Sequence, residues 1–266
     1  MTAAMTSAIQ NATVAALRAD PGLAALHRSL DVYYGDPARD RAMDALYATL
    51  LAAGDLAFDI GSHVGDRIGS FRRLGARAVG LEPQPDCARV VRSIYASDPQ
   101  VTLVEAACGP KPGRLKLHIN SANPTVTTAS RDFVRAADGA GGWEGQVWDR
   151  EVEVPVTTLD LLIAKYGVPA FVKIDVEGVE ADVLAGLTRP VAVLSFEFTT
   201  IQRDVAQACL DALGKLGPYR FDVALGESQA LTFGRWISAA KMSAHIAGLP
   251  HAANSGDVYA RLMARD

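Results

Sequence analysis

The sequence predicts an α/β fold in which helices cover both faces of a doubly wound, mostly parallel sheet of seven strands. From residue 55 onward, short apolar runs alternate with amphipathic helical segments, the pattern expected for parallel strands buried on both faces. An apolar fraction of 49% and a charged fraction of 21% are typical of a globular chain. The 266 residues suffice for one such domain and an extension.

The predicted strands are short and apolar, and glycine or acidic residues follow several of them. Five belong to the parallel core, over 56–60, 78–81, 101–104, 171–174 and 191–196, and two come late in the chain, over 219–223 and 257–263. Helices are expected between them over 67–74, 85–95, 159–166, 179–187, 201–216 and 236–246. In these segments apolar side chains recur at the spacing of one helix face.

Residues 1–54 contain only helical patterns and are expected to form an N-terminal helical extension that packs on the main domain, residues 55–266. Within the extension, Asp36 and Pro37 begin a helix as N-cap and first-turn proline. Gly54 is expected to end this helix, because glycine readily adopts the left-handed conformation that follows a last helical turn.

A long connection at about residues 110–155 interrupts the alternation of strands and helices. It holds two strand-like segments, 114–119 and 151–156, and between them a polar, glycine-rich stretch with Trp143 and Trp148. A connection of this length inside a compact domain is usually functional. We therefore expect a lid or substrate insertion, in which the tryptophans either contact the substrate or anchor the loop.

Charge and cysteine content exclude several classes of protein. A formal net charge of −4 is opposite to the basic surface typical of nucleic-acid binding. No apolar stretch approaches the ~20 residues of a membrane span, and no signal-peptide pattern is present. The three cysteines lie far apart and match no metal or redox spacing. We expect a cytoplasmic protein with reduced cysteines and no nucleic-acid partner; the sequence does not indicate an oligomeric state.

A glycine motif follows the first predicted strand. Asp59, Gly61 and Gly65 form the pattern D-x-G-x-x-x-G, where Gly61 allows a sharp turn and Gly65 a close approach to the next helix. Glu82 ends the second strand, at an offset suited to binding the two hydroxyls of a ribose. The glycine spacing is not the G-x-G-x-x-G of dinucleotide sites, and Asp59 suits the cationic amino group of S-adenosylmethionine.

The fourth core strand carries the candidate catalytic residues. Strand alternation places Lys173 and Asp175 on one face, so Asp175 emerges at the carboxyl end, where ligands collect in such sheets. We expect Asp175 to act as general base, with Glu177 and Glu197 orienting the substrate. Lys173 either keeps Asp175 ionised or pairs with an acid for structural reasons. The three carboxylates could also bind a divalent metal ion such as magnesium, although we do not favour this.

These segments together resemble the FkbM-type methyltransferase family. The resemblance rests on FDIGSHVGD, VGLEPQP, VTLVEAACG, VPVTTLDLL, FVKIDVEGVEADVLAG and LSFEF, and covers about residues 56–198. It implies a Rossmann-like, class I S-adenosylmethionine-dependent methyltransferase that O-methylates a hydroxyl of a small molecule or saccharide. By position, it places Asp59, Gly61, Ser62, His63 and Gly65 at the methionine part of the cofactor, Glu82 at the ribose, Glu105 and Ala106 at the adenine, and Asp175 and Glu177 beside the transferred methyl group.

Two other functions share the predicted fold. An NAD(P)-dependent oxidoreductase is disfavoured by the glycine spacing and because no tyrosine is followed by lysine four residues later. A non-catalytic nucleotide-binding module would not need both Asp175 and Glu177. Titration with S-adenosylmethionine and with NAD(P)H distinguishes the two cofactors, and a turnover assay tests for the inactive module.

Overall fold

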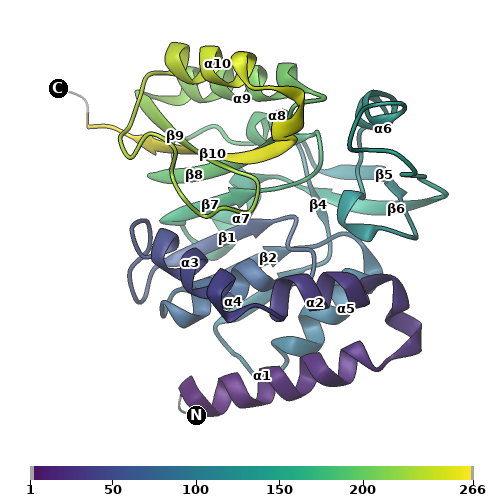
Figure 1. The fold of residues 1–266 in the computed structure, drawn as a ribbon. Helices are drawn as coiled ribbons and strands as arrows, with labels where there is room; N and C mark the ends of the chain where they lie inside the picture. The colour runs from purple at the N-terminus through teal and green to yellow at the C-terminus, as the bar shows by residue number, and fades with distance from the viewer. Residues whose placement is uncertain (1–2, 265–266) are drawn as a thin grey trace.

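The computed structural model describes residues 3–264 and is built around a seven-stranded sheet with helices on both faces (Figure 1). The strands are β1 (Leu56–Ile60), β2 (Arg77–Leu81), β3 (Val101–Val104), β7 (Phe171–Ile174), β8 (Val193–Thr199), β9 (Tyr219–Leu225) and β10 (Ser255–Leu262). Their order is β3-β2-β1-β7-β8-β10-β9. Of these strands, β10 alone runs in the opposite direction, so its pairings with β8 and β9 are antiparallel and the other pairings are parallel. The predicted doubly wound, mostly parallel sheet is confirmed.

The helices form two layers. One face of the sheet is covered by α3 (Pro37–Tyr47), α4 (Asp66–Arg73) and α5 (Pro85–Ile94), with α1 (Ala3–Arg18) and α2 (His27–Tyr34) outside them. The other face is covered by α7 (Leu159–Tyr166), α8 (Glu180–Ala185), α9 (Arg203–Leu216) and α10 (Ala239–Gly248). Short 3-10 helices lie over Pro21–Leu26, Pro124–Val126 and His251–Ala253.

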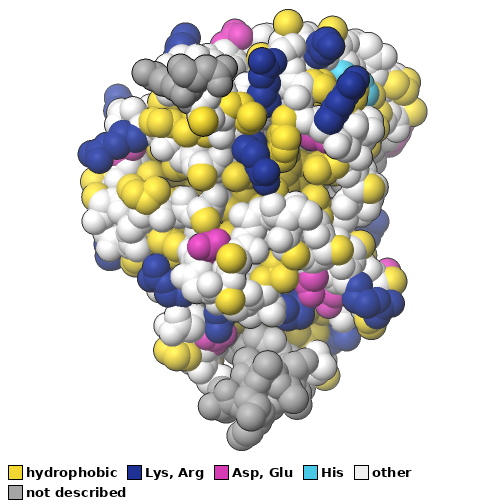
Figure 2. Space-filling view, turned by 90° about the vertical axis from the view of Figure 1, so that its left-hand side faces the viewer, with side chains coloured by type: hydrophobic (Ala, Val, Ile, Leu, Met, Phe, Trp, Pro, Cys, Tyr) yellow, Lys and Arg dark blue, Asp and Glu magenta, His cyan; other side chains and the backbone are white. Residues whose placement is uncertain are grey.

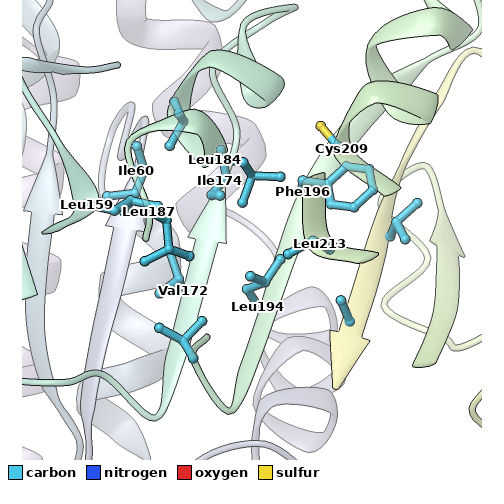
Figure 3. Close-up of a cluster of buried hydrophobic side chains, with 14 of the residues drawn as sticks. Ile60, Leu159, Val172, Ile174, Leu184, Leu187, Leu194, Phe196, Cys209 and Leu213 are labelled. Atoms are coloured by element: carbon cyan, nitrogen blue, oxygen red, sulfur yellow. The ribbon is translucent and has the colours of Figure 1, made fainter. Parts of the chain in front are cut away.

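The central strands are apolar on both faces because both faces are covered. All five residues of β1 are buried, and its side chains divide between two hydrophobic clusters. Ile60 packs with Val172 and Ile174 of β7 in the cluster beneath α7–α10 (Figure 3). Ala57 faces the opposite cluster with Phe171, beneath α3 and α4. Two cores therefore hold the strands in place and fix the positions of their carboxyl ends.

The N-terminal helices pack against the sheet through α3 and α4. Asp36 accepts a hydrogen bond from the Ala38 amide, as expected of an N-cap. The prediction that Gly54 ends this helix is wrong, because α3 ends at Tyr47. Tight turns follow, and they still bury the leucines at 50 and 51, which produced the helical pattern in the sequence.

The insertion folds as a small sheet of its own beside the main one. It consists of β4 (Ala107–Cys108), β5 (Gly113–Ile119) and β6 (Arg150–Thr157) in the order β4-β6-β5, together with α6 (Arg131–Ala137). Trp143 and Trp148 pack edge-on against Phe133 of α6, with ring centroids 5.2 and 6.2 Å apart. The tryptophans therefore anchor the insertion.

The amino ends of the parallel strands form the face shown in Figure 2. Hydrophobic side chains lie there between scattered lysines and arginines. Val168, just before β7, and Met263, just after β10, are 70% and 41% exposed. Among the described residues, no helix combines the length and the apolar character that crossing a membrane requires.

Candidate active site

A pocket lies at the opposite edge, where the carboxyl ends of β1, β2, β7 and β8 meet the insertion. Its empty volume of about 1040 Å³, which includes the part open to solvent, is large enough for a cofactor-sized molecule. Most of the residues predicted for the site line it: Asp59, Gly61, Ser62, His63, Glu82, Ala106, Asp175, Glu177 and Glu197. Side chains from separate parts of the sequence therefore converge as parallel-strand topology requires.

The turn after β1 depends on Gly61. Its φ of 86° lies in the left-handed region, and a Cβ atom here would be 1.8 Å from the carbonyl oxygen of Asp175. Glycine thus lets the tips of β1 and β7 come together. Ser62 stabilises the same turn by donating a hydrogen bond of 2.9 Å to the carbonyl oxygen of Asp59.

Gly65 does not line the pocket. It precedes α4 with a φ of 84°, and a Cβ atom at this position would be 2.9 Å from the ring of Tyr95, the residue that follows α5. Tyr95 also donates a hydrogen bond of 2.6 Å to the Gly65 carbonyl oxygen. The glycine at this position is therefore explained by the packing of α5 against the start of α4.

Glu82 is held rigidly at the tip of β2. One carboxylate oxygen accepts a hydrogen bond from the Gln84 amide and the other from the His63 amide, both at 2.7 Å. Burial raises the pKa of Glu82 to about 8, although these two hydrogen bonds act in the opposite direction. Each oxygen retains a lone pair for a ligand hydroxyl. This arrangement suits the predicted contact with a ribose.

His63 contributes its backbone amide to this arrangement, and its ring lines the pocket. The ring lies 3.5 Å from the hydroxyl of Thr125 and 3.5 Å from the sulfur of Cys87. Burial lowers the pKa of His63 to about 4, so the ring is neutral at neutral pH. His63 therefore adds no positive charge to the pocket.

Asp59 is the buried acid that most clearly lacks a partner. Asp59 is only 1% exposed, and its Oδ2 atom has no hydrogen-bond partner among the described residues. Burial raises its pKa to about 8, and the negative charge of Asp66 adds to this effect. Burying an unpaired carboxylate is costly, so such a group needs a cation. A cofactor with an amino group and a sulfonium fits this position.

Glu105 does not reach the pocket. Its carboxylate pairs with Arg92 of α5 on the outer surface, and about half of each of these two side chains is exposed. β3 ends at Val104, so Glu105 lies in the turn that follows and its side chain is directed outward. The next residue, Ala106, does line the pocket. The structure thus places only one of the two predicted adenine contacts at the site.

Lys173 is fully buried beneath the candidate catalytic residues. Its Nζ donates hydrogen bonds to Asp175 Oδ2 at 3.0 Å and to Asp257 Oδ1 at 2.6 Å. The two roles predicted for Lys173 are therefore combined in one contact network. Sequence reasoning missed Asp257, which lies opposite Glu197 in the register between β8 and β10. A carboxylate inside a predicted buried strand was the signal that could have identified it.

Asp175, Glu177 and Glu197 form a compact group of carboxyls, with one oxygen from each lying within 4.8 Å of the others. Burial tends to raise the pKa of Asp175, but the charge of Lys173 outweighs it and lowers that pKa. Burial and the charge of Asp175 raise the pKa of Glu177 and that of Glu197. Lys173 thus favours the ionised form of Asp175, while burial and the charge of Asp175 favour the protonated forms of Glu177 and Glu197. The sequence does not favour a divalent metal ion at this group, and the arrangement of the three carboxyls leaves that prediction untested.

Comparison with known proteins links this site to a described family. The family model described as "Methyltransferase FkbM domain" matches residues 59–214. A search of curated proteins found no match. Solved structures similar to this chain include precorrin-6y C5,15-methyltransferase from Geobacter metallireducens, with 15% identity, coverage of 83% of this chain and 87% of that chain, and a TM-score of 0.44. A putative O-methyltransferase from Klebsiella pneumoniae has 12% identity, coverage of 92% and 91%, and a TM-score of 0.45.

The unpartnered carboxylate of Asp59 should reduce the stability of the fold as the pH rises. Because its pKa rises from an ordinary value near 3.9 to about 8 in the folded chain, ionising it opposes folding between these two values. Asp59→Asn removes this cost. Relative to the wild type, we expect Asp59→Asn to raise the free energy of unfolding, and we expect this increase to be about 2–4 kcal/mol larger at pH 8 than at pH 5.

Urea unfolding at the two pH values measures this difference. Asp132→Asn, a change at an exposed residue of α6, serves as control and should alter stability little at either pH. A stability gain from Asp59→Asn that does not depend on pH would contradict the interpretation of Asp59.

Proposed function

Since the chain belongs to the FkbM methyltransferase family, we propose that it transfers the methyl group of S-adenosylmethionine to a hydroxyl of a small molecule or saccharide. When bound, this cofactor supplies a methyl group already activated by the positively charged sulfur. The protein then has to hold the cofactor, place the acceptor oxygen in line with the methyl group, and remove the hydroxyl proton.

The buried carboxylate of Asp59 is the observation that carries the assignment of the cofactor. Its unpartnered oxygen can pair with the amino group of the cofactor, and Glu82 can accept hydrogen bonds from the ribose hydroxyls. Ala106 lies in the wall of the pocket, where an adenine ring needs an apolar surface. The donor set thus fits a nucleoside that carries a cationic amino acid.

The charge of the pocket also favours this cofactor over a nicotinamide dinucleotide. Seven acidic side chains line the pocket: Asp59, Asp66, Glu82, Asp175, Glu177, Glu197 and Glu227. Among the described residues that line the pocket, Arg67 is the only lysine or arginine. The pyrophosphate of NAD(P)H would meet an arginine that is already paired with Asp66 and Glu227, whereas a cationic cofactor can be balanced by acids of the lining that ionise as it binds.

We assign to Asp175 the role of the base that removes the proton of the acceptor hydroxyl. Of the three carboxyls at the tips of β7 and β8, Asp175 is the one whose ionised form Lys173 stabilises. The hydrogen bond from Lys173 also fixes its position. Burial and the charge of Asp175 favour the protonated forms of Glu177 and Glu197, and in these forms the two glutamates can donate hydrogen bonds to the acceptor and orient it. A hydroxyl acceptor suits this set, because it can accept from the protonated glutamates and donate to the ionised aspartate.

A polar recess next to the pocket supports a polyhydroxylated acceptor. Arg28, Ser29 and Asn123 line this recess, which shares Tyr33 and Thr125 with the cofactor pocket. Ser29 and Thr125 approach each other to 3.4 Å between their hydroxyl oxygens. Hydroxyls, an amide and a guanidinium are groups that bind sugar hydroxyls well.

Calorimetric titration tests the assignment of the cofactor directly. We expect S-adenosylmethionine and S-adenosylhomocysteine to bind with a stoichiometry of one per chain, whereas NADH and NADPH give no binding heat. Binding of a nicotinamide cofactor without binding of either sulfur compound would overturn the proposal.

Asp175→Asn should separate cofactor binding from chemistry. We expect the affinity for S-adenosylhomocysteine to stay within about threefold, while methyl transfer falls by at least about 100-fold because the proton acceptor is lost. Transfer is measured from labelled S-adenosylmethionine into metabolites of a strain that lacks the protein. Glu153→Gln, on the exposed surface of β6, is the control. Near-normal transfer by the Asp175 variant would exclude Asp175 as the base.

Asp257→Asn tests whether Asp257 acts on catalysis through Lys173. With asparagine at this position, Lys173 interacts with Asp175 alone, so the pKa of Asp175 should fall and its strength as a base with it. We expect a lower kcat and an acidic limb of the pH–rate profile displaced to lower pH. A loss of stability with an unchanged pH profile would indicate a purely structural role.

A further inference from the structure

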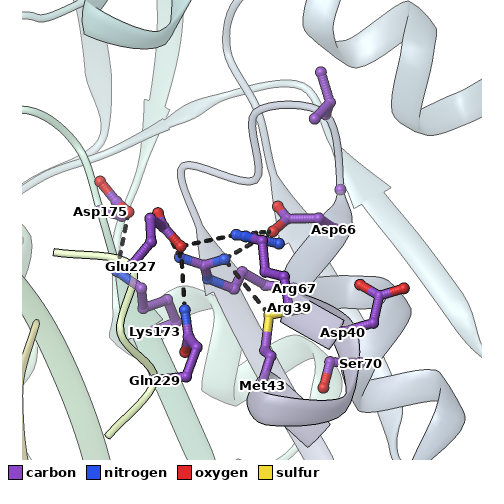
Figure 4. Close-up of polar contacts among 12 residues, drawn as sticks. Arg39, Asp40, Met43, Asp66, Arg67, Ser70, Lys173, Asp175, Glu227 and Gln229 are labelled. Atoms are coloured by element: carbon purple, nitrogen blue, oxygen red, sulfur yellow. Dashed lines mark hydrogen bonds and ion pairs between the residues drawn. The ribbon is translucent and has the colours of Figure 1, made fainter. Parts of the chain in front are cut away.

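Two arginines hold the carboxylate of Glu227 at the edge of the cofactor pocket (Figure 4). Arg39 Nη2 lies 2.9 Å from Glu227 Oε2. Arg67 Nη2 donates to both carboxylate oxygens of Glu227, each at 3.3 Å. Arg39 comes from α3, Arg67 from α4, and Glu227 from the segment after β9. Three segments that are far apart in the sequence thus form a carboxylate-binding site.

The two arginines and the glutamate differ in how firmly they are fixed. The side chains of Arg39 and Arg67 are 9% and 10% exposed, whereas that of Glu227 is 49% exposed. Glu227 also lies in an irregular segment between β9 and α10. The arginines are therefore a built part of the fold, and Glu227 is the partner that can leave.

The charges around Arg39 and Arg67 show why the site that these two arginines form needs an anion. Asp66 Oδ2 lies 2.8 Å from Arg39 and 2.7 Å from Arg67, so it neutralises one of the two positive charges. Glu227 neutralises the other. Nε and Nη1 of Arg39 and Nε of Arg67 still lack hydrogen-bond partners among the described residues. If Glu227 turned away, Arg39, Arg67 and Asp66 together would have a net positive charge next to the pocket.

Asp59 provides the complementary site for a cation. It lines the same pocket as Arg67, and its unpartnered carboxylate is close enough for the charge of Arg67 to act on it. An α-amino acid carries an ammonium and a carboxylate on one carbon atom. A cation site and an anion site side by side are what recognition of such a group requires.

We propose that Arg39 and Arg67 bind the α-carboxylate of the amino-acid part of the cofactor, and that Glu227 occupies this place only while the cofactor is absent. The inference rests on the proposed function, since it takes S-adenosylmethionine as the ligand. Arg39 and Glu227 both lie outside the residues that the family model matches. Gln229, whose amide donates to Glu227 Oε2 at 3.1 Å, can keep Glu227 bound after it leaves the arginines.

Glu227→Gln tests the exchange, because it removes the competing charge while keeping the size of the side chain. We expect S-adenosylhomocysteine to bind about tenfold more tightly to this variant than to the wild type, since a larger fraction of the protein is ready to bind it. Affinity for 5′-methylthioadenosine, which has no amino acid, should not change. Arg39→Gln should weaken S-adenosylhomocysteine about tenfold and leave 5′-methylthioadenosine unaffected.

Isothermal titration of the full chain with both compounds measures these affinities, with thermal unfolding as a check on folding and Glu153→Gln as control. Weaker or unchanged binding of S-adenosylhomocysteine by Glu227→Gln would overturn the exchange and leave Glu227 as a structural clamp. Equal effects on both compounds would also contradict it. Failure of the proposed function looks different, because the wild type would then bind neither compound.

Discussion

The structure depends on one constraint: carboxylates are concentrated at the tips of adjoining parallel strands, with few cations to neutralise them. Asp59 is the next-to-last residue of β1, and Glu82 and Asp175 directly follow β2 and β7. The two hydrophobic cores on either side of the sheet prevent these strands from separating. The cost of this concentration is reduced by the raised pKa values of several of these acids and by Lys173. At Asp59 the pKa rises to about 8, and Oδ2 has no hydrogen-bond partner among the described residues. A cationic ligand is the remaining way to reduce this cost.

The same constraint divides the pocket into regions with different chemistry. At β2, two backbone amides hold Glu82 in a geometry that suits neutral hydroxyls. At β7 and β8, Lys173 lowers the pKa of Asp175, while burial and the charge of Asp175 raise the pKa of Glu197. Near α4, Arg67 brings the only lysine or arginine charge of the lining close to Asp59. Binding, proton transfer and recognition of an amino acid can therefore take place along one row of strand tips.

Much of the fold and the centre of the site could be predicted from the sequence, because both follow from local patterns. Buried parallel strands are continuous apolar runs, and the residue that ends such a run must lie at the ligand-binding edge, as Asp59, Glu82 and Asp175 do. The failures occur where tertiary packing decides. The direction of the Glu105 side chain depends on a turn, and Gly65 is required by a ring from another helix. Arg39 and Glu227 meet only through the folded chain, and no local pattern marks them.

The most direct test of the central claim is a crystal structure of the protein with S-adenosylhomocysteine. We expect the ribose hydroxyls to contact Glu82, the amino group to contact Asp59, and the sulfur to face Asp175. A structure in which the compound binds elsewhere, or in which Asp59 remains without a cationic partner, would contradict this claim.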